Sequence, residues 1–488
     1  MTERILDAER TLARFQPYDR AQVRDRLMQA LSGWQDKIVV LDDDPTGVQT
    51  VHDVYVYTDW RPESLRAAFE APERMFFVLT NSRSMSEEET QRVHREIARA
   101  VAAAARAAGR DFVLVSRGDS TLRGHYPLET QTLREELERE TGRPYDGEIL
   151  LPFFLEGGRY TVDDVHYVRM GDRLVPAGQT EFARDKTFGY ESSNLRAWIQ
   201  EKTRGACAAE RVASIGLETL RRCDYAAVVE QLMGLSGFDR AIVNAVDDAD
   251  VEVFATALIE AIRRGKRFLF RSAAALPKAL GGVSDRPLLT REELTDAQNP
   301  HGGLIVVGSH VERTTRQLQA LRRAAFVEFV EFNQHLVTDE AAFEAEQRRV
   351  VAQAQAAICA GRTVAVYTRR ERFDLGTGDR EAELRLSVRI SQAVTGIVER
   401  LTARPAFIVA KGGITSSDIG TKALRVRRAL VLGQILKGVP VWLTDEESKF
   451  PRMPYVIFPG NVGDDEALYD AVVKLQRDHR EDVTVDAV

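Results

Sequence analysis

The sequence predicts an α/β protein made of two α/β domains, each built on a largely parallel sheet. Short aliphatic or β-branched runs alternate with longer amphipathic stretches from Lys37 onward, which is typical of repeated strand and helix units. A chain of 488 residues is also too long for one hydrophobic core. The alternation lapses between Leu280 and Gly303, where turn-forming residues gather, so we place the domain boundary there.

The first domain is expected to cover residues 37–285 and to follow a helical N-terminal extension, residues 1–36. Its clearest helix is Ser86–Ala108, because Ser86 suits an N-cap, glutamates fill the first turn, and Gly109 follows the end. Apolar runs around this helix are predicted to form strands at Ile38–Leu41, Phe76–Leu79, Phe112–Val115, Glu148–Leu151, Ala241–Val243 and Phe268–Phe270.

The second domain is expected to cover residues 300–488 and to repeat the same alternation. We find no internal repeat of fixed period, so the two domains are not predicted to be copies of one unit. Its predicted strands are Leu304–Val307, Val327–Val330, Thr363–Tyr367, Ala406–Val409, Ala429–Leu432 and Tyr455–Phe458.

Composition and charge exclude several classes of function. A small imbalance between 67 basic and 74 acidic side chains predicts no broad attraction to nucleic acid or to acidic membranes. The chain starts without the apolar core of a signal peptide, and no later apolar run approaches the roughly 18 residues of a membrane span. Three widely spaced cysteines suit neither a disulfide framework nor zinc. We expect a cytoplasmic protein, and its size allows a homodimer.

Three carboxylates follow the first predicted strand, as Asp42, Asp43 and Asp44 ahead of Thr46. In open α/β sheets, ligands collect beyond the carboxyl ends of strands, so these acids would meet a substrate there. Clustered aspartates repel one another, an arrangement that a general base or a Mg²⁺ site would use. The alternative is an acidic turn in which an aspartate caps a helix.

A second polar segment, Ser116–His125, also comes just after a predicted strand. Its glycines, hydroxyls and arginines suit a carboxylate-binding loop, because a guanidinium can grip a carboxylate with two hydrogen bonds. Arg83 follows another strand in the same manner. A structural turn is the alternative for both.

Three strand-to-glycine loops in the second domain favour a nucleotide site. Gly412 and Gly413 separate a strand from the hydroxyls that open a helix, and small residues of this kind let phosphate approach the backbone. Gly308 with Ser309, and the segment Phe458–Gly463, repeat the arrangement. No loop matches the P-loop pattern, so the prediction depends on the three together.

These segments, in this order, resemble the four-carbon acid sugar kinase family, whose members phosphorylate threonate, erythronate or 3-oxo-tetronate with ATP. The family's early Asp-Asp-x-Thr-Gly is similar to Asp43–Gly47, and its Asp-Ser-Thr-Leu-Arg-Gly is similar to Asp119–Gly124. Later similarities are Pro152, Gly158–Thr161, His166–Val168, Gly308–Ser309, Gly412–Ser416 and Gly460–Gly463. Departures are Asp42, Pro45, His125 and the N-terminal extension, and they leave the identity of the substrate open.

The resemblance implies an ATP- and Mg²⁺-dependent kinase with an active-site cleft between its domains, and it assigns no metal ligand to the protein. It implies that Asp43 or Asp44 is catalytic. The substrate residues it implies are Thr46, Arg83, Asp119, Ser120, Arg123, Gly124 and Arg159. The nucleotide residues it implies are Ser309, Gly412, Gly413, Ile414, Thr415, Gly460 and Asn461.

Our hypothesis is that Arg123, with Arg83, holds the carboxylate of a sugar acid while Asp43 or Asp44 deprotonates its terminal hydroxyl. Domain closure would exclude water from the transfer to that hydroxyl. Two alternatives stay open. A phosphatase of the haloacid dehalogenase type would use Asp42 as nucleophile and Asp44 as acid, and a non-catalytic sensor would bind sugar acid and nucleotide with the same loops.

Overall fold

The computed structural model describes residues 3–296, 298–371, 373, 380–460 and 462–476. The chain forms two compact units: the first contains Met1–Arg286 and Arg427–Val431, and the second contains Pro287–Val426 and Leu432–Val488. The predicted α/β class is confirmed, since each unit has a mainly parallel sheet with helices on it. Within the described residues, no helix is both long enough and apolar enough to cross a membrane.

The sheet of the first unit is parallel, in the order β10-β11-β6-β12-β5-β2-β4-β3. Its central strand β2 (Lys37–Asp42) is buried along its whole length, as its apolar run predicts. Arg428–Val431 adds an antiparallel edge to β3. The other strands are β3 (Val54–Tyr57), β4 (Met75–Leu79), β5 (Phe112–Arg117), β6 (Gly147–Leu151), β10 (Ala213–Ile215), β11 (Asp239–Val243) and β12 (Phe268–Ser272).

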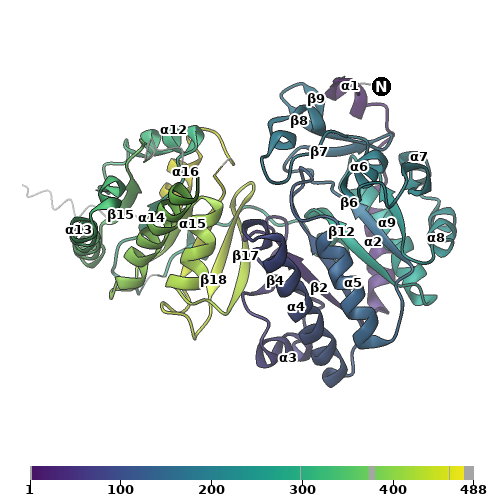
Figure 1. Cartoon of the computed structure of the whole chain (residues 1–488), viewed down its shortest axis with the longest axis horizontal. Helices are drawn as coiled ribbons and strands as arrows, with labels where there is room; N and C mark the ends of the chain where they lie inside the picture. The colour runs from purple at the N-terminus through teal and green to yellow at the C-terminus, as the bar shows by residue number, and fades with distance from the viewer. Residues whose placement is uncertain (1–2, 297, 372, 374–379, 461, 477–488) are drawn as a thin grey trace, which may run out of the picture. The chain divides into compact units, whose positions relative to one another are not determined.

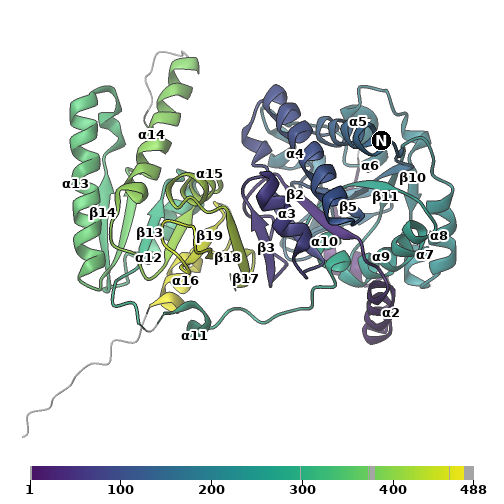
Figure 2. The same cartoon turned by 90° about the horizontal axis from the view of Figure 1, so that it is seen from below.

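Helices α3, α4 and α5 cover one face of this sheet and share one hydrophobic cluster with it (Figure 2). Helix α4 confirms the predicted Ser86–Ala108 helix, because Ser86 forms a capping box with Glu89 and Gly109 closes the helix at φ 60°. Helices α2, α9 and α10 pack together on the other face. The helices are α2 (Arg20–Ser32), α3 (Pro62–Glu70), α4 (Glu87–Ala108), α5 (Leu128–Thr141), α6 (Leu195–Lys202), α7 (Leu217–Arg221), α8 (Tyr225–Met233), α9 (Asp248–Arg263) and α10 (Ala275–Gly281).

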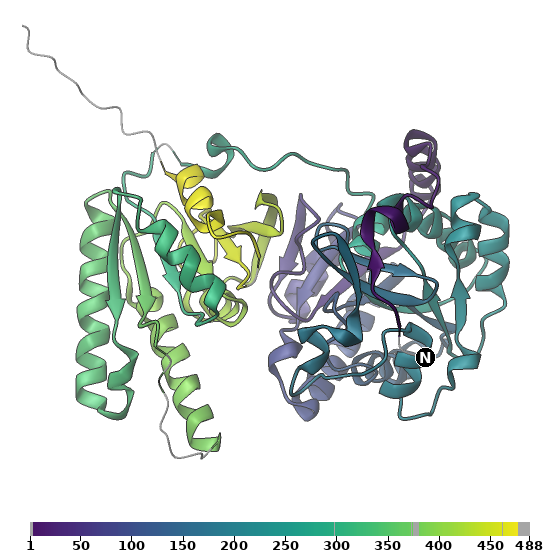
Figure 3. The same cartoon turned by 90° about the horizontal axis from the view of Figure 1, so that it is seen from above.

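A small antiparallel sheet, absent from the predicted elements, follows β6 in the first unit. It consists of β7 (Arg159–Val162), β8 (Val165–Met170), β9 (Arg173–Pro176) and β1 (Leu6–Asp7). Part of the N-terminal extension is therefore a strand, and the helix α1 (Ala8–Leu12) follows it (Figures 1 and 3). The carboxylate of Glu3 also accepts hydrogen bonds from the amides of Ser193 at 3.1 Å and Asn194 at 2.6 Å.

The sheet of the second unit has the order β17-β18-β19-β16-β13-β15-β14 and is antiparallel where β18 meets β19. The predicted strand at Ala406 begins two residues later, at Ile408, and the predicted strand Ala429–Leu432 is part of a longer one that starts in the first unit. The strands are β13 (Leu304–Val307), β14 (Val327–Phe332), β15 (Thr363–Thr368), β16 (Ile408–Lys411), β17 (Arg428–Leu436), β18 (Val439–Thr444) and β19 (Pro454–Phe458).

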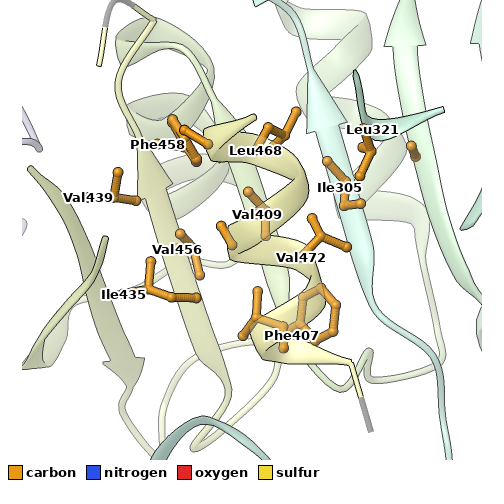
Figure 4. Close-up of a cluster of buried hydrophobic side chains, with 14 of the residues drawn as sticks. Ile305, Leu321, Phe407, Val409, Ile435, Val439, Val456, Phe458, Leu468 and Val472 are labelled. Carbon is orange, nitrogen blue, oxygen red and sulfur yellow. The ribbon is translucent and has the colours of Figure 1, made fainter. Parts of the chain in front are cut away.

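Helices α12 and α16 pack against one face of the second sheet (Figure 4). Leu468 and Val472 of α16 lie against Val409 and Val456, which are side chains of neighbouring strands. Helices α13 and α14 contact each other, and α13 packs on β14 and β15. The helices are α11 (Arg291–Leu294), α12 (Glu312–Leu321), α13 (Glu340–Cys359), α14 (Arg380–Arg400), α15 (Gly413–Asp418), a π-helical turn Ile419–Ala423, and α16 (Ala467–Leu475).

Candidate functional site

An arginine and two aspartates meet beyond the carboxyl ends of β2 and β4. Arg83, in the 3₁₀ turn η1 (Ser82–Ser84) after β4, donates from Nε to Asp43 Oδ2 at 3.0 Å and from Nη2 to Asp43 Oδ1 at 2.6 Å. Its Nη1 donates to Asp44 Oδ2 at 3.4 Å. All hydrogen-bonding nitrogens of Arg83 are thus directed at the protein's own carboxylates.

The three consecutive aspartates differ in accessibility. The side chains of Asp42 and Asp43 are 2% exposed, whereas that of Asp44 is 18% exposed. Asp44 Oδ1 accepts hydrogen bonds from the amide of Thr46 at 2.9 Å and from its hydroxyl at 2.5 Å. Asp44 is therefore held in one orientation and still reaches solvent, which a base acting on a small molecule needs.

Burial and neighbouring charges also separate the pKa values of these aspartates. Burial raises the pKa of Asp42 to about 7, with Arg117 opposing the shift and the other two aspartates adding to it. Burial acts to raise the pKa of Asp44 as well, but Arg83 and the hydrogen bonds from Thr46 outweigh it and the pKa is lowered. Asp44 is consequently ionised at neutral pH.

Asp42 is enclosed by the chain rather than presented to a ligand. A Cβ atom on Gly47 would lie 1.9 Å from Asp42 Oδ2, so only glycine fits above this carboxylate. Arg117 Nη1 donates to Asp42 Oδ1 at 3.3 Å from beside it. A phosphatase nucleophile must be ionised and must touch the incoming phosphate, and a carboxylate that is 2% exposed does not fit this role.

We expect Asp42→Asn to change how stability depends on pH. The folded protein keeps a proton on Asp42 up to about pH 7, whereas the unfolded chain releases it near pH 4. Between these values the free energy of unfolding falls as pH rises, by about 1.4 kcal/mol per pH unit from this group. Asparagine does not titrate, so the variant should gain stability relative to wild type as pH rises from about 4 to about 7.

Urea unfolding at several pH values measures this gain. Asp172→Asn is the matched control, because the side chain of Asp172 is 85% exposed. A stability difference between Asp42→Asn and wild type that stays constant over the whole range would contradict the prediction.

The loop after β5 presents a second ion pair. Asp119 Oδ2 accepts from Arg123 Nε at 2.8 Å and from the hydroxyl of Thr121. Burial acts to raise the pKa of Asp119, but Arg83 and Arg123 outweigh it, so the pKa is lowered. The carbonyl of Ser120 lies 2.8 Å from His166 Nε2, which ties this loop to the small antiparallel sheet.

The same loop wraps around Arg271, a residue that our sequence analysis missed. A Cβ on Gly118 would lie 2.0 Å from Arg271 Nη1, and one on Gly124 would lie 2.7 Å from Nη2. Arg271 donates to Glu129 Oε2 at 2.9 Å and to the carbonyl of Arg123 at 2.8 Å. The signal was available, because Arg271 comes directly after the predicted strand Phe268–Phe270.

Arg159 reaches this group from the small antiparallel sheet. Its Nε is buried and has no hydrogen-bond partner in the described structure. Arg159 and Arg123 both lie against the ring of Phe182, at 5.5 Å and 5.2 Å from its centroid. Burial lowers the pKa of Arg159, Asp119 opposes this and Arg123 adds to it. The structure thus brings together Asp43, Asp44, Thr46, Arg83, Asp119, Ser120, Arg123, Gly124 and Arg159 as neighbours or near neighbours.

The second unit contains a cavity of about 730 Å³. Every described residue that the sequence assigned to nucleotide binding lines it, namely Ser309, Gly412, Gly413, Ile414, Thr415 and Gly460. Asn461 lies outside the described residues. Residues far apart in the sequence therefore converge on one site.

Two glycines allow the loops that line this cavity to approach each other closely. A Cβ on Gly308 would lie 2.5 Å from Thr415 Oγ1, so any side chain there would collide with the adjacent loop. Gly412 has φ 118°, a conformation that favours glycine. The close approach of these two loops explains why the predicted Gly-Ser and Gly-Gly pairs occur together.

Part of the lining was not predicted. One face of α14 lines the cavity through Ser387, Ile390, Ser391, Val394 and Thr395. Their spacing is that of adjacent turns of a helix, and this amphipathic pattern was the available signal. Gln334, Thr368 and Arg370 also line the cavity, and no local motif indicates them. Among the described residues, no group of three or more His, Cys, Asp or Glu is placed to hold a metal ion.

Comparisons with known proteins agree with this division of the chain. The family described as a sugar-binding N-terminal domain matches residues 38–280, and the family described as a nucleotide-binding C-terminal domain matches residues 304–468. No curated protein matches at a significant level.

Two solved structures share the fold. A Haemophilus influenzae protein of the DUF1537 family has 18% identity and a TM-score of 0.59 over 90% of this chain and 100% of its own. A Salmonella typhimurium LT2 protein, provisionally named as a tRNA synthase, has 16% identity and a TM-score of 0.62 over 90% of this chain and 99% of its own.

Proposed function

Because the chain belongs to the family that joins a sugar-binding N-terminal domain to a nucleotide-binding C-terminal domain, the architecture of four-carbon acid sugar kinases, we propose that it phosphorylates a small sugar acid with ATP. The proposal depends on the combination of two features in one chain. The first unit has an accessible, ionised carboxylate, Asp44, among arginines, and the second unit has a glycine-lined cavity. An acceptor hydroxyl needs the former and a nucleotide needs the latter.

In this proposal Arg159 binds the carboxylate of the sugar acid. Arg83 is already paired with Asp43 and Asp44, and Arg123 with Asp119, whereas Arg159 Nε has no partner in the described structure. A buried guanidinium nitrogen without a partner is destabilising, and a carboxylate oxygen would satisfy it with a charge-assisted hydrogen bond. Arg123 then lies with Arg159 against the Phe182 ring and is not the main clamp.

Asp44 then orients and deprotonates the acceptor hydroxyl. It is the most exposed of the three aspartates, and Thr46 fixes one of its oxygens so that Oδ2 faces the site together with Arg83. The oxygen that forms attacks the terminal phosphorus of ATP, and ADP leaves. A lowered pKa makes Asp44 a modest base, which suits phosphoryl transfer because positioning and charge neutralisation supply most of the catalysis.

We propose that Mg²⁺ binds to this protein as a complex with the nucleotide. It usually binds substrate phosphates and water with few protein carboxylates. Bound in this way it would neutralise phosphate charge. The loops of Ser309, Gly412 and Gly460 are the proposed seat of the phosphates.

An ADP-release assay with ATP and Mg²⁺ tests the function. The panel contains D- and L-threonate, D- and L-erythronate, 3-oxo-tetronates, and sugar acids with five and six carbons. We expect release to depend on one acid. Binding of ATP and of an acid without release would favour a non-catalytic sensor, and failure to bind ATP at all would overturn the proposal.

A further inference from the structure

Arg370 is a basic residue of the nucleotide cavity with one donor left over. It follows β15 and lines the cavity beside Ser309. Its Nη2 donates to the carbonyl of Ser309 at 2.6 Å and to Thr315 Oγ1 at 3.0 Å, and its Nε donates to Thr315 Oγ1 at 3.2 Å. The remaining nitrogen, Nη1, is buried and has no hydrogen-bond partner in the described structure.

The surroundings of Arg370 leave its charge poorly compensated. The atoms to which it donates are a carbonyl oxygen and a hydroxyl oxygen, and it forms no ion pair with any described residue. Burial lowers the pKa of Arg370, and no acid among the described residues opposes this shift. A buried nitrogen of this kind gains most from an anionic oxygen, because a charge-assisted hydrogen bond both satisfies the donor and balances the charge.

The position of Arg370 also indicates where that oxygen lies. Arg370 holds the carbonyl of Ser309 and the side chain of Thr315, so it joins the loop before α12 to the first turns of that helix. The positive end of the α12 dipole points toward the same loop. Thr314 of this helix donates to the carbonyl of Gly460 at 3.3 Å, so another of the cavity's glycine loops adjoins it.

We propose that Arg370 Nη1 binds the polyphosphate tail of the nucleotide, held in place for this contact by Ser309 and Thr315. The inference rests on the proposed nucleotide site and adds to it the cation that its loops lack. The guanidinium remains fixed by two of its nitrogens while the third reaches the ligand. Arg370 is therefore a binding residue whose contribution grows with the number of phosphates.

The test compares the binding of adenosine, AMP, ADP, ATP and inorganic tripolyphosphate by calorimetry. In Arg370→Ala we expect the dissociation constant of ATP to rise about 10- to 100-fold, as for loss of a hydrogen bond between charged groups. The loss should be smaller for AMP, and adenosine should bind within about twofold of wild type. Arg370→Lys keeps the positive charge but lacks the planar set of guanidinium donors, so it should give an intermediate loss of ATP affinity.

Arg369→Ala is the matched control, because Arg369 is adjacent, pairs with Glu331 at 2.9 Å and does not line the cavity. An equal loss for adenosine and ATP would mean a structural role and would overturn the inference, and so would unchanged ATP binding in Arg370→Ala. If wild type binds tripolyphosphate through Arg370 but no nucleotide, the proposed function fails and the anion site stands. If Arg370→Ala does not fold, Arg370→Lys is used to measure whether the loss of affinity increases from adenosine to AMP, ADP and ATP.

Discussion

Asp44→Asn is expected to lower kcat about 10²- to 10⁴-fold, the usual contribution of a general base. The change keeps the shape of the side chain and the acceptor that Thr46 contacts at 2.9 Å, so the KM of the sugar acid should change little. It removes the capacity to take the hydroxyl proton, and it also replaces the Oδ2 that accepts from Arg83 Nη1 at 3.4 Å with an amide nitrogen. Steady-state ADP release with the acid that wild type uses measures both constants.

Asp172→Asn controls for the removal of one carboxylate from the first unit, since the side chain of Asp172 is 85% exposed. Asp43→Asn provides a second comparison, because Asp43 is buried and holds Arg83 through two hydrogen bonds. We expect Asp43→Asn to lower thermal stability as well as activity. If Asp44→Asn keeps turnover within about threefold of wild type, Asp44 is not the base.

Arg159→Ala is expected to raise the KM for the sugar acid by at least about 30-fold. Truncating one partner of a buried, hydrogen-bonded charge pair costs about 2–5 kcal/mol, and 1.4 kcal/mol corresponds to a factor of ten. The ATP dependence should be unchanged, because Arg159 belongs to the first unit and the nucleotide cavity to the second. Substrate titrations of ADP release at saturating ATP measure the shift.

Arg173→Ala is the control that tests whether the expected rise in KM is specific to Arg159 among the arginines of the small sheet. Arg173 lies on β9 and its side chain is 68% exposed, so its removal should leave both constants near the wild-type values. A neutral sugar lacks the carboxylate, so it can serve as a competitive inhibitor that does not need Arg159. If it inhibits wild type and Arg159→Ala equally, the rise in KM comes from loss of the carboxylate contact and not from a distorted substrate site. A KM for the acid that is unchanged in Arg159→Ala would refute the assignment.

The large sheets of both units followed from local patterns. Strands such as β2, β5 and β13 are buried along most or all of their length, so each reads as a continuous apolar run. Their parallel pairing then brings Asp42, Asp43 and Asp44 to the same edge of the sheet as Arg83. This is why the position of the aspartate cluster could be predicted.

The small antiparallel sheet was missed because its strands are short and its turn is unusual. Asp163 and Asp164 join β7 to β8 with φ angles of 50° and 67°, a two-residue turn in which Asn-Gly or Asp-Gly is the common signal. A pair of aspartates has the polarity of a loop, so the segment lacked a recognisable hairpin. The consequence was that Arg159 could be named but not placed.

The sequence also could not show which arginine has a side-chain nitrogen without a hydrogen-bond partner among the described residues. Arg83, Arg123 and Arg159 are equivalent as residue types, and their partners come from separate segments of the chain. Arg370 presents the same difficulty, because β14, α13 and β15 all lie between its anchors, Ser309 and Thr315, and Arg370 itself. Pairing of this kind is set by tertiary contacts and not by local spacing.

The N-terminal strand has a consequence for protein production. A truncated protein that began at Lys37, near the start of the family match, would lose β1 and the carboxylate of Glu3. The free edge of β9 would then expose unpaired amides and carbonyls to other molecules, and such edges promote aggregation. The same truncation would remove α2, which packs on α9, so poor solubility of such a protein would report on the missing N-terminal elements and not on the catalytic design, and expression trials should retain the first residues.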